Sequence, residues 1–203
     1  MSVQNVIAGQ ENSPIDNPFS IGIHPMHIDI QNVDNQFFIL KKESLKAHCW
    51  AIGECGLDRR SSVFMQEQEM IFKKQIQWAM GLKKPVVVHC VKAFSELVKV
   101  KKECAPNIPM IVHGFNNNEK IFMELVKNDF FFSFGSTILQ PNSNATNALK
   151  NVPTDRFFLE TDDKKIGIKA IYEAASSILN IEENVLKALI INNLKQIKPN
   201  FNE

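Results

Sequence analysis

The chain has 203 residues, of which 44% are hydrophobic and 22% are charged, which is typical of a globular protein. The 23 Lys and Arg residues against 22 Asp and Glu residues give a formal net charge of +1, so the whole chain exerts no general attraction on nucleic acid. No apolar run is long enough to cross a membrane, and the polar N-terminal residues lack a signal-peptide core. We therefore expect one domain over residues 1–203, a cytoplasmic location and no membrane partner.

The four cysteines contain no Cys-x-x-Cys pair. Strand alternation sends Cys55 and Cys90 away from the side chains of Glu54 and His89. We therefore expect buried, reduced thiols, and neither a disulfide framework nor a zinc–cysteine site.

The first part of the chain alternates short apolar runs with longer mixed segments. Strands are predicted near residues 5, 22 and 52, and residues 9–19 are predicted as a loop. A mixed helix is predicted over 34–47. The clearest helix covers 66–82, where apolar residues recur at a spacing close to 3.6.

From residue 85 onward, strands and helices alternate regularly. Strands are expected near residues 87, 112, 132 and 159, and helices over 93–103, 119–126, 167–179 and 183–197. Short apolar strands separated by helices favour a parallel sheet of the α/β class. Seven strands are predicted in all, one fewer than in a complete (β/α) barrel.

Four of these strands end at or near a side chain that can bind metal: Glu54, His89, His113 and Asp162. Parallel strands of a barrel bring their carboxyl ends to one face. Imidazoles with carboxylates suit zinc or manganese, and a carboxylate that bridges two metals suits attack on a phosphodiester. A single histidine at a strand end more often has a structural role, so the interpretation as a metal site depends on the grouping of all four residues.

Five motifs occur in an order and spacing that resemble the TatD-type metal-dependent deoxyribonucleases. They are Gly22-Ile23-His24-Pro25, Gly53-Glu54-Cys55-Gly56-Leu57-Asp58, Val88-His89-Cys90, His113-Gly114-Phe115 and Glu160-Thr161-Asp162. The resemblance runs from about residue 20 to the C-terminus. It implies a TIM-type (β/α) barrel, shortened here at the N-terminus to about seven strands.

The resemblance also implies the roles of individual residues. The acid that matches Glu54 bridges two metals, and His89 and His113 complete one metal site. Asp162 serves the other metal and, as general base, helps to activate water. The family supplies two further ligands from an N-terminal His-x-His, which this sequence does not contain. We therefore expect a divalent metal (Zn, Mn or Mg) with one site retained.

The expected activity is hydrolysis of phosphodiester bonds, with DNA or a small phosphodiester as substrate. His24 and Lys92 are the candidate substrate-binding residues; Val91 stands where many relatives carry an arginine. Two alternatives stay open: a non-catalytic TatD-like binding or structural protein, and an amidohydrolase-like enzyme that cleaves a non-phosphate bond. Asp58 either supports the site or caps the next segment, and His27 and His48 are expected at the surface.

Overall fold

The computed structural model describes residues 3–10, 18–104, 107–162 and 166–197. These residues fall into two compact units, residues 1–110 (the N-terminal unit) and residues 111–203 (the C-terminal unit). The interpretation of the whole chain as one domain stays a prediction.

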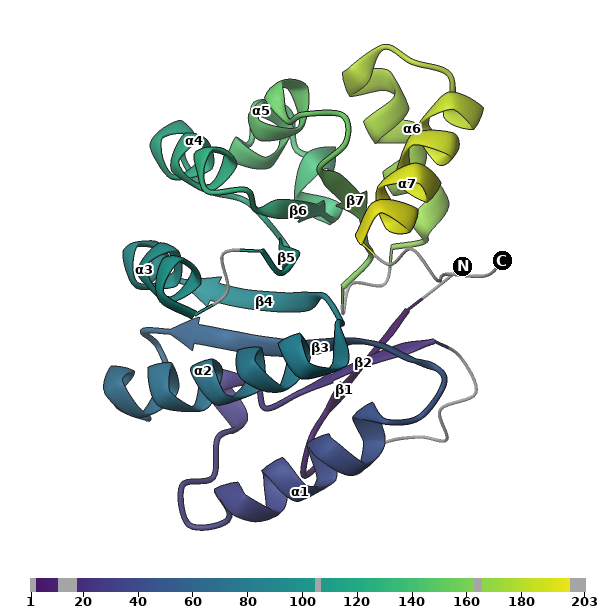
Figure 1. The fold of residues 1–203 in the computed structure, drawn as a ribbon. Helices are drawn as coiled ribbons and strands as arrows, with labels where there is room; N and C mark the ends of the chain where they lie inside the picture. Colours follow the sequence, from purple (N-terminus) through teal and green to yellow (C-terminus); the bar gives the residue numbers. More distant parts are fainter. Residues whose placement is uncertain (1–2, 11–17, 105–106, 163–165, 198–203) are drawn as a thin grey trace. The chain divides into compact units, whose positions relative to one another are not determined.

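The N-terminal unit contains four strands that pair in chain order and all run parallel (Figure 1). They are β1 (Gln4–Ile7), β2 (Phe19–Gly22), β3 (Cys49–Asp58) and β4 (Val86–Val91). The connections contain η1 (Pro25–His27), α1 (Val33–Ser44) and α2 (Met65–Leu82), and α3 (Phe94–Cys104) follows β4. The predicted strands near residues 5, 22, 52 and 87 are therefore confirmed, as is the helix over 66–82.

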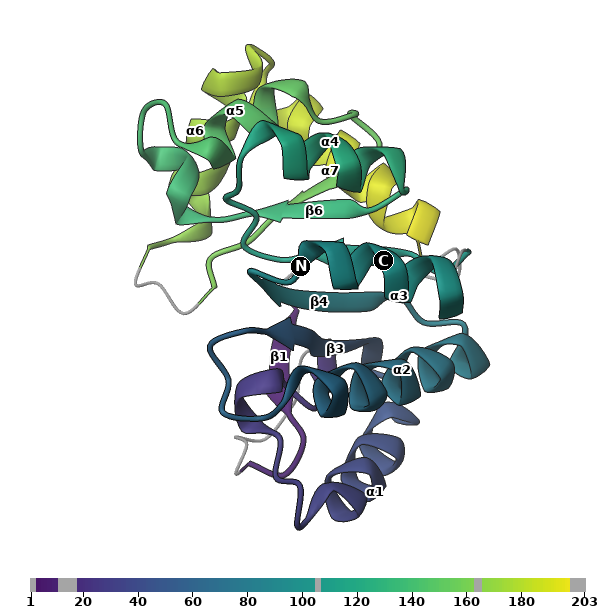
Figure 2. The same cartoon turned by 90° about the vertical axis from the view of Figure 1, so that its left-hand side faces the viewer.

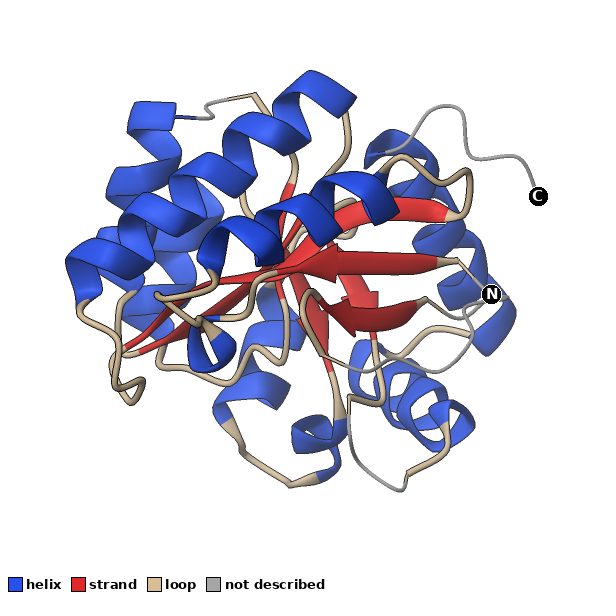
Figure 3. Ribbon diagram, turned by 90° about the horizontal axis from the view of Figure 1, so that it is seen from below, coloured by secondary structure: helices blue, strands red, loops and turns tan. Residues whose placement is uncertain are grey.

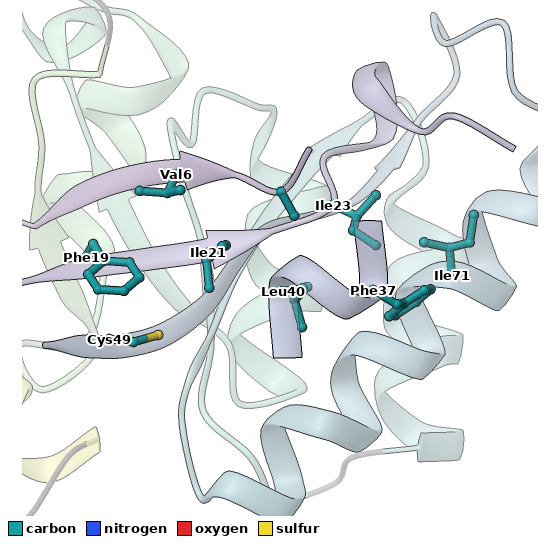
Figure 4. Close-up of a cluster of buried hydrophobic side chains, with 9 residues drawn as sticks. Val6, Phe19, Ile21, Ile23, Phe37, Leu40, Cys49 and Ile71 are labelled. Carbon is teal, nitrogen blue, oxygen red and sulfur yellow. The ribbon is translucent and has the colours of Figure 1, made fainter. Parts of the chain in front are cut away.

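One hydrophobic cluster joins the first strands of this unit to its first two helices. Val6, Ile21 and Cys49, from three successive strands, are each at most 2% exposed. Leu40 of α1 and Ile71 of α2 close the same cluster, as Figure 4 shows. Burial of these side chains contributes most of the free energy that fixes α1 and α2 against the strands.

Helix α2 is the main support of β3. The two elements are in extensive contact, and α2 and α3 lie side by side against β3 and β4 (Figure 2). The apolar face of α2 includes Ile71, Phe72 and Ile76, all at most 1% exposed. Two glutamines, Gln68 and Gln75, are also buried on α2.

The C-terminal unit is built on three short parallel strands, coloured red with the other strands in Figure 3. They are β5 (Met110–Val112, whose first residue closes the N-terminal unit), β6 (Phe131–Phe134) and β7 (Phe157–Leu159). The other elements are α4 (Glu119–Lys127), η2 (Ser136–Leu139), α5 (Asn144–Asn151), α6 (Ile168–Leu179) and α7 (Glu183–Ile197).

Phenylalanines form the centre of this unit. The rings of Phe115 and Phe122 each lie 5.1 Å, between centroids, from the ring of Phe132. Phe130 and Phe134 are also fully buried. The aromatic strand β6 is therefore core packing and offers no exposed surface on which bases could stack.

Helix α5 was not predicted from the sequence. Its eight residues include three asparagines, which have low helix propensity. The helix forms because the Ser143 hydroxyl accepts a hydrogen bond from the Thr146 N–H at 3.0 Å and because Ala145 and Leu149 are buried. Among the residues that the structure describes, no helix is both long and apolar enough to cross a membrane.

Candidate active site

Glu54 lies in the interior of β3 and not at the end of the strand, where the sequence had suggested it. The strand continues for four more residues to Asp58. The Glu54 N–H donates to Asn5 Oδ1 at 2.9 Å, and the Ser20 hydroxyl donates to the same oxygen at 3.3 Å. Side chains from β1 and β2 therefore hold the backbone at Glu54, whose own side chain is 16% exposed.

Two glycines allow β3 to approach β4 closely on either side of Glu54. Gly53 has φ +139° and Gly56 has φ +146°, which are conformations that other residues rarely adopt. A Cβ atom on Gly56 would lie 2.0 Å from the His89 carbonyl oxygen, and one on Gly53 would lie 2.3 Å from the Val87 carbonyl oxygen. The pairing of Gly56 with His89 brings the Gly-Glu-Cys-Gly segment next to the histidine of β4.

Three predicted site residues of the N-terminal unit lie together. His24 Nε2 is 3.9 Å from Glu54 Oε2, and the rings of His24 and His89 are 4.2 Å apart between centroids. One donor atom from each of the three residues lies within 4.8 Å of those from the other two. His24 lies in the turn after β2, Glu54 in β3 and His89 in β4, and the parallel pairing of these strands brings the three residues together.

The protonation of His24 argues against a role as metal ligand. Its Nδ1 accepts the Met26 N–H at 3.1 Å, so the neutral ring carries its proton on Nε2. Nε2 is the atom that lies near Glu54, and a protonated nitrogen has no lone pair for a metal. The contact with Met26 also orients the turn after β2. The substrate-binding role of His24 stays a prediction.

His89 has the opposite arrangement. Its Nε2 lies 2.9 Å from Asp58 Oδ2, and the Asp58 side chain is fully buried. Burial opposes the charge on Asp58, but hydrogen bonds from Arg60 and His89 outweigh it and hold the pKa of this carboxyl well below its usual range. The ionised carboxylate can only accept a hydrogen bond, so His89 Nε2 donates, and in the neutral ring Nδ1 carries the lone pair that a metal requires.

Arg60 was missed by the sequence reasoning. Its Nε and Nη2 donate to Asp58 at 3.0 and 2.7 Å, and its backbone N–H donates to Asp58 Oδ1 at 2.8 Å. The only signal was the run Asp58-Arg59-Arg60 directly after the strand. Asp58 therefore supports His89 and also orders the turn that follows it.

The C-terminal unit contributes the other predicted ligands. His113 follows β5, and its Nδ1 lies 3.8 Å from Glu160 Oε1. The Gly114 N–H donates to the same carboxylate oxygen at 2.7 Å. A ring nitrogen of His113 and a carboxylate oxygen of Asp162 lie within 4.8 Å of each other. Each unit thus brings together two of the four predicted metal ligands.

The remaining candidate substrate-binding residue lies where the sequence suggested. Lys92 is exposed directly after β4, and its carbonyl accepts from Arg59 Nε at 2.8 Å. His27 and His48 are exposed, as predicted.

All four cysteines are thiols in the structure; Cys49 and Cys55 are buried, as expected, whereas Cys90 and Cys104 are only half-buried. Burial raises the pKa of Cys90 to about 12 and also raises that of Cys55, so both stay protonated near neutral pH.

Sequence comparison identifies the class of protein that this arrangement defines. The family described as TatD related DNase matches residues 2–197, nearly the whole chain. The chain therefore belongs to the TatD-related DNase family, as the five motifs had suggested.

Relatives in this family carry names that describe nucleases. The chain is 29% identical over 197 residues to a "Putative deoxyribonuclease TATDN1 homolog" of Enterocytozoon bieneusi; the match covers 87% of this chain and 69% of that protein. It is 31% identical to the "3'-5' ssDNA/RNA exonuclease TatD" of Pantoea ananatis over 70% of this chain. That match spans only 55% of the Pantoea protein, little more than half its length.

Solved structures of the family show the same fold. The TatD homologue YJJV of Escherichia coli matches with a TM-score of 0.73 at 20% identity, covering 89% of this chain and 76% of that one. The predicted TIM-type α/β barrel fold class is thus confirmed, and the described residues contain the seven strands that were predicted.

Proposed function

We propose that this chain is a metal-dependent hydrolase that cleaves phosphodiester bonds in DNA. The observation that carries the proposal lies within the N-terminal unit. Asp58 directs the lone pair of His89 to Nδ1, and the Glu54 carboxylate lies beside the same ring. An imidazole oriented by a buried carboxylate, next to a second carboxylate, is a common arrangement of metal ligands.

The donor set fits a divalent transition metal. Imidazole nitrogens and carboxylate oxygens suit zinc or manganese, and magnesium would depend more heavily on the carboxylates. A divalent ion bound by these residues would polarise the phosphate and make water more acidic. We assign Glu54, His89 and His113 as ligands of one metal position, as the family resemblance implies.

The remaining assignments concern the proton and the substrate. Asp162 is the proposed general base, which takes the proton from the attacking water, and a ligand of any second metal. His24 Nε2–H donates to a phosphate oxygen of the substrate, because its Nδ1 is already an acceptor for Met26. Lys92, exposed after β4, contacts phosphate as a point charge.

We expect one well-occupied metal position in the 203-residue chain. The sequence has no His-x-His, and the loss of two imidazoles removes most of the donor set of the second position. With a single metal the charge on the phosphate is less completely neutralised, so we expect slower hydrolysis than by a two-metal enzyme. The cytoplasmic location stays a prediction.

The test is hydrolysis of a fluorescent single-stranded DNA in the presence of manganese, with and without a chelator. Asp162→Asn should reduce the rate by at least about a hundredfold, as removal of a general base typically does, and Glu54→Gln should reduce it at least as much because it removes a metal ligand. Asp155→Asn is the matched control, because Asp155 is exposed. Cleavage that the chelator and Asp162→Asn leave unchanged would contradict the proposal.

Two further measurements test the alternative functions, an amidohydrolase-like enzyme and a non-catalytic binding protein. Turnover of a chromogenic amide or carboxylic ester, without turnover of DNA, would favour the amidohydrolase-like enzyme. Binding of single-stranded DNA without cleavage under any metal would favour the non-catalytic protein. RNA in place of DNA tests the breadth of substrate, since the Pantoea relative is named for both.

A further inference from the structure

Helix α2 buries two glutamines that the proposed chemistry does not use. Gln68 is 1% exposed and Gln75 is fully buried, although glutamine is usually found at the surface. They are seven residues apart, which is close to two helical turns, so both project from the same face of α2. Both therefore lie on the face of α2 that is buried in the N-terminal unit.

Gln75 forms a two-point contact with the residue before His24. Its Oε1 accepts the Ile23 N–H at 2.7 Å, and its Nε2 donates to the Ile23 carbonyl at 3.1 Å. Ile23 lies just beyond β2, where the backbone leaves the ladder and needs other partners. The side chain of Gln75 thus takes the place of a neighbouring strand and fixes the peptide that carries His24.

Gln68 makes the same contact with the last residue of β3. Its Oε1 accepts the Asp58 N–H at 2.8 Å, and its Nε2 donates to the Asp58 carbonyl at 3.1 Å. The same Nε2 also donates to the Val63 carbonyl at 2.7 Å, which closes the turn between β3 and α2. Asp58 is the residue that orients His89.

Only a carboxamide can make both contacts. It offers an acceptor oxygen and a donor nitrogen on one planar group, whereas glutamate offers acceptors alone and methionine neither. A buried N–H or C=O left without a partner destabilises the local backbone. The two positions therefore require glutamine for its hydrogen bonds and not for its volume.

We propose that Gln68 and Gln75 are positioning residues, through which helix α2 sets the orientation of two different parts of the site. Gln68 acts through Asp58 on the metal ligand His89, and Gln75 acts through Ile23 on the substrate-facing His24. The inference rests on the proposed function for the meaning of these two histidines. The two glutamines should consequently have separable effects, one on metal binding and the other on substrate.

The variants Gln68→Met and Gln75→Met remove the hydrogen bonds with little change in length. Gln68→Met should weaken binding of manganese by about 10–100-fold, the usual effect of losing support behind a ligand. Gln75→Met should leave manganese affinity unchanged and raise KM for single-stranded DNA by about tenfold, the loss of about one hydrogen bond to a charged group.

Two controls come from the same helix. Gln77→Met alters an exposed glutamine and should change nothing. Ile76→Val removes one methylene from a fully buried side chain, so it lowers the stability of α2 without touching either glutamine. Metal affinity is measured by calorimetry, and Tm is recorded for every variant. Ile76→Val then shows how much a loss of stability by itself changes metal affinity and KM.

A metal-free readout separates this inference from the proposed function. Nitrogen-15 NMR of the histidine rings should show His24 with its proton on Nε2 in the unaltered chain. Gln75→Met should change the ring signals of His24 more than those of His89, which lies 4.2 Å away between ring centroids, and Gln68→Met should do the reverse. If the unaltered chain binds no manganese but these changes occur, the proposed function fails and the positioning role stands.

Hydrogen exchange provides a test that needs no variant. In the unaltered protein, the Ile23 and Asp58 N–H groups should exchange as slowly as the N–H groups within β3, because each donates to a buried glutamine. Rapid exchange at both positions would overturn the proposal. Ring signals unchanged in both methionine variants, with manganese affinity and KM equal to those of the Gln77→Met control, would overturn it equally.

Discussion

His89 Nε2 and Asp58 Oδ2 lie 2.9 Å apart, with the Asp58 side chain fully buried at the end of β3. This contact joins the carboxyl ends of two neighbouring parallel strands. It also determines which nitrogen of the neutral His89 ring carries the lone pair, because an ionised carboxylate can only accept a hydrogen bond. The chemistry of His89 is thus set by a residue four positions after Glu54 on the adjacent strand.

Asp58→Asn should weaken manganese binding and lower stability. The amide cannot hold the same His89 proton and the Arg60 guanidinium, so we expect a loss of metal affinity of about 10–100-fold. The free energy of unfolding should fall by about 1.5–3 kcal/mol, the usual value of a hydrogen bond to a charged group. Calorimetry and urea unfolding measure the two effects. Metal affinity equal to that of the exposed control Asp155→Asn would show that Asp58 has no part in the site.

Gly56→Ala should disrupt the contact between β3 and β4. The new Cβ would meet the His89 carbonyl oxygen at 2.0 Å, at a φ of +146° that alanine rarely adopts. The backbone of His89 must then move, and we expect a loss of stability of about 3 kcal/mol or more. Gly81→Ala is the control, since a Cβ there meets nothing within 4 Å and α2 continues through it. It should stabilise the protein by about 0.5–1 kcal/mol. Thermal unfolding of both variants tests this prediction, and equal Tm values would contradict the expected loss of stability in Gly56→Ala.

Tyr172, the one tyrosine of the chain, provides an optical probe of the packing between α6 and α7. Burial raises the pKa of its phenol, Lys187 of α7 lowers it, and Glu183 raises it further. The folded protein should therefore keep this proton at a pH where the unfolded chain, with a pKa of about 10, has lost it. The contribution to stability is complete below about pH 10 and is lost as the pH rises through the folded-state pKa. Absorbance at 295 nm reads the titration, and identical curves with and without urea would refute the prediction.

The arrangement of the strands could be predicted from the sequence because each strand is a short apolar run of its own. Periodicity also located α2, because its apolar face repeats every 3.6 residues. The same signal could not find α5, which is only eight residues long and contains three asparagines, a residue type that favours turns. Periodicity also did not show that β3 continues past Glu54. Glycines often indicate the end of a strand, whereas Gly53 and Gly56 lie within β3, where its backbone approaches β4 closely.

The candidate site was predicted at the level of residue type, and its supporting contacts were not. Glu54 and His89 are marked by the apolar runs before them. The partners Asn5 and Gln75 are about 50 residues distant in sequence from the groups they bind, and no local pattern records such a pair. From the sequence alone, a buried glutamine on an amphipathic helix cannot be distinguished from an exposed one, because the strand end that it contacts is not known.

The most direct test of the account is a calorimetric titration of the metal-free chain with manganese, repeated for Glu54→Gln and His24→Ala. We predict one tightly bound equivalent in the unaltered chain, because two imidazoles of the second position are absent. Glu54→Gln should abolish binding, since it removes a charged ligand, and His24→Ala should leave it within about threefold, since Nε2 of His24 carries a proton. Two tight equivalents, or equal loss of binding in both variants, would contradict the account.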